Sequence, residues 1–151
     1  MSIAHEVRCI FEGFNFGPPC TPEDLVRAEH ELGHPLPAVL RELYLSFDGF
    51  LGPTAAVFFS PLLQRDNSAG DSLVSFTRFL RGEDYFPGFH QRAVIFGSDG
   101  CGSNWGMLID SPGVVFEWHP EQGEEYTVVG TSPLDAWLKG KALYEDSAPD
   151  A

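Results

Sequence analysis

Residues 93–129, AVIFGSDGCGSNWGMLIDSPGVVFEWHPEQGEEYTVV, consist of four short β-rich runs separated by turn-forming segments. The expected strands are residues 93–96, 106–110, 114–118 and 126–129, which are short runs rich in apolar, β-branched or aromatic side chains. Because the connecting segments have the length of hairpin loops, neighbouring strands are expected to pair antiparallel. This stretch therefore predicts a sheet meander.

Helical patterns lie on both sides of this meander. Upstream, helices are expected at residues 22–32, 37–47 and 72–80, with a strand at 55–59 between the second and third. The third helix should turn its largest side chains inward, namely Leu73, Phe76, Phe79 and Leu80. A last helix should begin at Ser132-Pro133. The order predicts an α+β fold with N-terminal helices, an antiparallel sheet meander and a C-terminal helix packed on the sheet.

The size and composition fit a single globular domain. The chain has 151 residues, of which 43% are hydrophobic and 13% aromatic, and this excludes a disordered chain. We expect residues 1–20 to form an N-terminal extension packed on the domain and residues 21–144 to form the domain itself. Residues 145–151 should form a frayed acidic tail.

The charge balance is strongly acidic. Nine Lys and Arg residues against 22 Asp and Glu residues give a formal net charge of −13. This charge repels nucleic-acid phosphates and anionic membrane surfaces, so neither is expected as a direct partner. A basic protein is the natural complement, and no cofactor is expected.

The chain carries no sign of export. Cys9, Cys20 and Cys101 match no disulfide framework, which favours reduced thiols. The N-terminus lacks the pattern of a signal peptide, and no stretch has the 18 apolar residues of a membrane span. A cytoplasmic location is therefore expected.

The acidic residues are unevenly distributed. Residues 93–138 contain seven Asp and Glu residues but no Lys or Arg. Such a surface can simply be solubilising, or it can steer a basic partner, and the tryptophans within it can be binding anchors or core residues. The candidate partner-binding residues are Asp99, Trp105, Glu117, Trp118, Glu121, Glu124 and Glu125.

Residues 30–34, His-Glu-Leu-Gly-His, match the motif in which two histidines one helical turn apart bind zinc and a glutamate acts as general base. However, Gly33 lies inside the match and Pro35 follows it, so the helix should end before His34 can share a face with His30. We expect no metal ligand and no catalytic residue. A zinc-dependent hydrolase using His30, Glu31 and His34 is the alternative function.

The loop at residues 97–105 is rich in glycine. It lacks both the Lys-Ser/Thr pair of a phosphate-binding loop and the ligand spacing of a calcium loop. A tight loop at a binding surface is therefore the favoured interpretation. Cys101 lies in this loop without a close basic neighbour, so a nucleophilic role is not favoured.

Several segments recur in a familiar order. An acidic helix opens at residues 21–24 and closes at Leu32-Gly33, and Leu36-Pro37 restarts an aliphatic helix that closes at residues 46–50. Later matches are Ile95-Phe96-Gly97-Ser98-Asp99-Gly100, Val115-Phe116-Glu117-Trp118 and the late helix entered through Thr131-Ser132-Pro133-Leu134. This set, spanning about residues 21–138, resembles the SUKH superfamily, in the branch of the yeast cell-wall synthesis regulator and its bacterial relatives.

The resemblance implies a non-enzymatic protein-binding module. Many bacterial members of the superfamily look like immunity proteins, which neutralise a toxin domain that is often a nuclease, and yeast members act as interaction hubs. The resemblance thus predicts an immunity protein that binds a basic toxin domain, with a regulatory hub without inhibitory activity as a further alternative.

Overall fold

The computed structural model describes residues 2–52, 54–64, 71–82 and 86–147. For residues 146 and 147 it describes the backbone only. The helices are α1 (Ile3–Ile10), α2 (Pro22–Leu32), α3 (Ala38–Ser46), α4 (Leu73–Gly82), α5 (Pro133–Ser147) and the 3-10 helices η1 (Gly88–Arg92) and η2 (Pro120–Gln122). The strands are β1 (Asn15–Phe16), β2 (Phe50–Leu51), β3 (Val57–Phe59), β4 (Ala93–Ser98), β5 (Asn104–Leu108), β6 (Val115–Trp118) and β7 (Thr127–Gly130).

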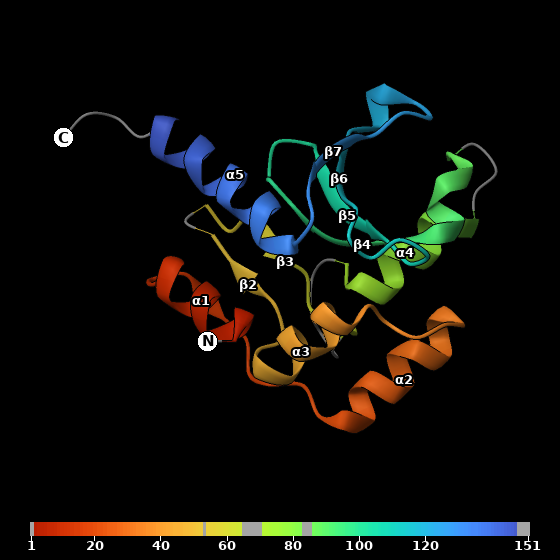
Figure 1. The fold of residues 1–151 in the computed structure, drawn as a ribbon, viewed down its shortest axis with the longest axis horizontal. Coiled ribbons are helices and arrows are strands. Elements are labelled where there is room, and N and C mark those ends of the chain that lie inside the picture. Colours follow the sequence, from red (N-terminus) through yellow and green to blue (C-terminus); the bar gives the residue numbers. More distant parts are fainter. Residues whose placement is uncertain (1, 53, 65–70, 83–85, 148–151) are drawn as a thin grey trace.

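The strands form two antiparallel sheets, of order β1-β2-β3 and β4-β5-β6-β7 (Figure 1). The second sheet is the predicted meander, and the α+β fold class is confirmed. The first sheet was predicted only at β3, because strands of two residues leave no periodic pattern. The sheets adjoin where the Ser60 N–H donates to the Phe96 carbonyl at 2.7 Å.

Local sequence explains the bounds of α2. The Thr21 hydroxyl accepts from the Asp24 N–H at 3.1 Å, and the Asp24 carboxylate accepts from the Thr21 N–H at 3.0 Å. This reciprocal cap satisfies two otherwise unpaired groups. At the other end Gly33 adopts φ 84°, a left-handed conformation that closes the helix. The helix predicted at residues 22–32 is therefore confirmed.

The four-stranded sheet lies between two hydrophobic clusters, with α5 on one side of it and α4 on the other (Figure 1). On one face it packs against α5, and Trp137 donates its indole N–H to the Phe58 carbonyl at 2.6 Å. On the other face it packs against α4 and η1. Gly97 allows the two sheets to meet, since a Cβ there would lie 1.9 Å from the Phe58 carbonyl oxygen.

Three features differ from the sequence-based expectations. Val7 of α1, a helix that was not predicted, and Phe11 just after it are fully buried in the main core. At the C-terminus α5 continues through Glu145, whereas a frayed tail was expected; residues 148–151 lie outside the described residues. On α4, Phe79 is 49% exposed, so the prediction that it faces inward was wrong. The core face of α4 is formed by Leu73, Val74, Thr77 and Leu80.

Candidate partner-binding surface

The β4–β5 loop and the β6–β7 turn lie at the same end of the four-stranded sheet. β4 ends at Ser98 and β6 at Trp118, and both run toward this end. The two segments touch, because a Cβ placed on Gly102 would come within 2.8 Å of the His119 ring. Gly102 also has φ 102°, so glycine is required there for both reasons. The glycine-rich loop is thus built to pack against the neighbouring turn.

Asp99 shapes this loop from within. The side chain is buried, and its Oδ1 accepts from the backbone N–H groups of Cys101 at 2.7 Å and Ser103 at 3.1 Å. Its backbone carbonyl accepts from the Tyr144 hydroxyl at 3.1 Å, which ties the loop to α5. The carboxylate therefore stabilises the loop conformation instead of facing solvent.

Trp105 and Trp118 are both core residues, with 0% and 1% of their surface exposed. Trp105 packs edge-on against Phe58 and donates its indole N–H to Glu117 at 3.2 Å. Trp118 lies on the opposite face of the sheet and donates to the Gly123 carbonyl at 2.9 Å. Each ring buries a large apolar area and has its one polar group satisfied internally. Neither ring is placed at the surface to anchor a partner.

Most acids of residues 93–138 have internal or ionic partners. Glu117 pairs with Lys139 at 2.8 Å, and Asp110 lies 3.5 Å from Arg92. The carboxylate of Asp135 accepts from the backbone N–H groups that precede α5, at residues 131 and 132. Arg92 and Lys139 lie directly outside the stretch that has no Lys or Arg. In the folded protein each of them pairs with an acid inside that stretch.

Within residues 93–138, the acids without a partner lie on the β6–β7 turn. Glu121, Glu124 and Glu125 are exposed, and among the residues that the structure describes none of the three has an ion-pair partner. Because charges at an exposed turn are poorly compensated, they dominate the local potential. Of the seven sequence-predicted site residues, these three remain available for contact.

The His-Glu-x-x-His match does not form a ligand pair on one helix face. α2 ends at Leu32, and His34 lies beyond the left-handed Gly33. The His34 ring contacts the Pro35 carbonyl through Nδ1 at 2.8 Å and Arg81 through Nε2 at 2.8 Å. A neutral ring with its proton on Nδ1 satisfies both contacts. The described part of the chain contains no group of three or more His, Cys, Asp or Glu residues placed to hold a metal ion.

Arg81 is the centre of this contact network. Its guanidinium donates to the carbonyls of Leu32 at 3.2 Å, His90 at 3.0 Å and Ala93 at 2.8 Å, in addition to the contact with His34. Burial lowers the pKa of Arg81. One cation thereby links the end of α2, helix α4, η1 and the start of β4.

His90 is buried beside Arg81, and Nε2 finds no hydrogen-bond partner among the described residues. Its ring packs against Trp118, with centroids 4.7 Å apart. Burial, with a smaller contribution from the charge of Arg81, lowers the pKa of His90 from 6.5 to about 4. The folded protein therefore holds this histidine neutral.

We expect the free energy of unfolding to fall as the pH is lowered from about 6.5 to about 4. In this window the unfolded chain binds a proton at residue 90 that the folded chain excludes, which costs at most about 1.4 kcal/mol per pH unit. Urea unfolding at several pH values measures how steeply the free energy of unfolding depends on pH. His90→Phe should have a shallower slope than the natural protein, and equal slopes would contradict the assignment.

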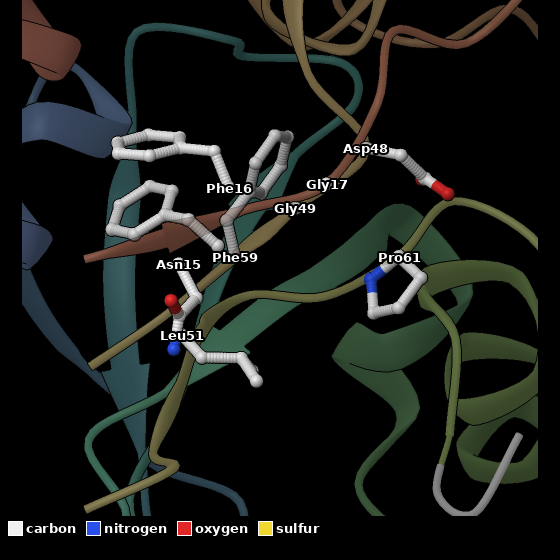
Figure 2. A pocket seen from close by; sticks show the side chains of 9 residues that line it. Asn15, Phe16, Gly17, Asp48, Gly49, Leu51, Phe59 and Pro61 are labelled. Atoms are coloured by element: carbon white, nitrogen blue, oxygen red, sulfur yellow. The ribbon is translucent and has the colours of Figure 1, made fainter. Parts of the chain in front are cut away.

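A separate apolar hollow of about 270 Å³ lies beside β1 and β2 (Figure 2). Its lining includes Phe16, Leu51 and Pro61. Asp48 is the one charged residue among the described lining residues, and its Oδ1 accepts from the Leu62 N–H at 2.8 Å. The hollow thus offers apolar contact, without the converging polar groups of a catalytic pocket.

The structure therefore describes a small α+β domain whose polar clusters shape loops, and in which the unpaired acids of residues 93–138 lie together on one turn. Comparison with protein families shows that the chain belongs to the SMI1 / KNR4 family (SUKH-1), which matches residues 19–140. At family level the chain is accordingly a non-catalytic module of the immunity or regulator type. A search of curated proteins finds no match. In the described residues, no helix has the length and apolar character needed to span a membrane.

Proposed function

We propose that this protein is an immunity protein that acts in the cytoplasm by binding and neutralising a basic toxin domain. Membership of the SUKH-1 family supports a non-catalytic binding role. The net charge of −13 supports a basic partner, and a nuclease domain, which must itself hold phosphate, is the natural candidate.

The observation that carries the proposal is the exposed acidic turn between β6 and β7. Glu121, Glu124 and Glu125 lie within five residues on a turn that Trp118 and His119 hold in place. A fixed group of like charges attracts a basic surface before contact and orients it. The same group disfavours acidic proteins, so it contributes to partner choice.

Co-expression tests the inhibitory function. The proposal expects a toxin domain encoded next to this gene; produced alone in a bacterial host, this domain should stop growth, and production of this protein should restore it. The two proteins should also co-purify. Growth arrest without rescue would contradict neutralisation, and a stable complex without rescue would favour the regulatory-hub alternative. Rescue should persist in His30→Ala and His34→Ala; loss of rescue together with bound zinc would favour the hydrolase alternative.

A further inference from the structure

Partly exposed aromatic side chains lie on α4 and on neighbouring segments, on the side of the four-stranded sheet that α4 covers. We call Phe76, Phe79, Phe86 and Tyr126 the aromatic row. The Phe76 and Phe79 centroids are 6.4 Å apart, and those of Phe79 and Phe86 are 5.4 Å apart. Phe79 is 49% exposed, and the other three are partly exposed.

Two buried rings, Trp118 and Phe89, connect Phe86 to Tyr126. Phe86 lies 6.4 Å from Trp118, Trp118 lies 6.0 Å from Phe89, and Phe89 lies 5.0 Å from Tyr126. The row therefore rests on the second hydrophobic cluster and is held in place by it. Its surface rings are pre-ordered, which reduces the entropy lost when a partner binds.

The aromatic row borders the acidic turn. Tyr126 directly follows Glu124 and Glu125 in the chain. Trp118, beneath the row, donates its indole N–H to Gly123 within the same turn. In Figure 1, α4 and the β6–β7 turn lie on the side of the sheet away from α5. The carboxylates of the acidic turn thus directly adjoin Tyr126, one member of the row.

The neighbouring arginines are committed elsewhere. Arg81 is held by backbone carbonyls and His34, and Arg92 lies against Asp110. Arg78 lines a hollow on the side of α4 that faces α2, together with Arg27. The row therefore combines aromatic faces and negative charge, and these arginines do not supply it with a cation.

We propose that the aromatic row and the adjacent Glu124 and Glu125 bind a segment of a partner protein that carries arginine between apolar residues. The planar guanidinium can stack on a ring while the carboxylates form ion pairs with it. The chain shows this contact internally, where the Arg8 guanidinium lies 4.9 Å from the centre of the Phe16 ring. Apolar neighbours of the arginine would cover the remaining ring surface. The proposal rests on the proposed function for the basic nature of the partner.

The test uses a synthetic octapeptide of alternating leucine and arginine, titrated into the full chain labelled for NMR. Amide shifts are expected to concentrate on α4, Phe86 and residues 118–126. Phe79→Ser should weaken binding about fivefold to tenfold. Leu45→Ser is the matched control, since Leu45 is 46% exposed on another face, and it should bind as the natural protein does.

Two further arms keep the test decisive if Phe79→Ser fails to fold. The double variant Glu124→Gln/Glu125→Gln should weaken binding more than Glu42→Gln on α3, and a peptide with citrulline in place of arginine should bind weakly. Shifts that concentrate elsewhere, or equal binding of both peptides, would overturn the proposal. With the co-expressed toxin domain, rescue that is insensitive to Phe79→Ser would overturn only the assignment of the aromatic row as the binding surface. Absence of rescue by the natural protein would instead overturn the proposed function.

Discussion

Arg81→Met is expected to lower the free energy of unfolding by about 3 kcal/mol, because it removes the guanidinium hydrogen bonds to three part-buried carbonyl groups. Methionine has a similar length and preserves most of the packing, so the change isolates the lost hydrogen bonds. The natural network spans segments far apart in the chain, from Leu32 to Ala93. Its loss should therefore loosen the attachment of α2 as well as that of α4.

The matched control is Arg78→Met, three residues earlier on the same helix, where the side chain is exposed. That change should alter the free energy of unfolding by less than about 0.5 kcal/mol. Urea unfolding at neutral pH measures both. If the two variants lose equal stability, Arg81 is not the centre of the network. A second readout is the pKa of His90, which should rise in Arg81→Met because the nearby positive charge is gone.

The elements predicted best are those whose bounds are set locally. Thr21, Pro22 and Gly33 specify the start and end of α2 within one segment, so the helix could be assigned from its own residues. The sheet meander was likewise visible in turn residues between short β-rich runs. The strands β1 and β2 could not be predicted from the sequence, because strands of two residues form only through pairing with a distant segment.

The candidate site was predicted less completely, because burial and pairing depend on the assembled fold. Both faces of the four-stranded sheet are covered, so Trp105 and Trp118 are buried although they alternate with polar residues. Arg92 and Lys139 bracket the acidic stretch, but only the register of β4 and β5 and the position of α5 show which acids they neutralise. Phe79 fits the helical period, yet it lies outside the narrow core face of α4.

The second large effect is expected in the kinetics of partner binding. If the acidic turn steers a basic toxin domain, the association rate constant should fall about tenfold or more between low and moderate ionic strength, because salt screens exposed charges. The triple variant Glu121→Gln/Glu124→Gln/Glu125→Gln should associate more slowly at low salt. Its association rate constant should also depend less on ionic strength. The control Glu6→Gln/Glu12→Gln/Glu42→Gln removes the same net charge from exposed positions on other elements.

Stopped-flow association with the neighbouring toxin domain, measured against ionic strength for the natural protein and both triple variants, tests the central claim most directly. We predict a steep dependence for the natural protein and the control variant, and a slower, flatter one for the turn variant. A rate that does not change with salt, or an equal loss of rate in the two variants, would contradict the assignment of the β6–β7 turn as the surface that receives the partner.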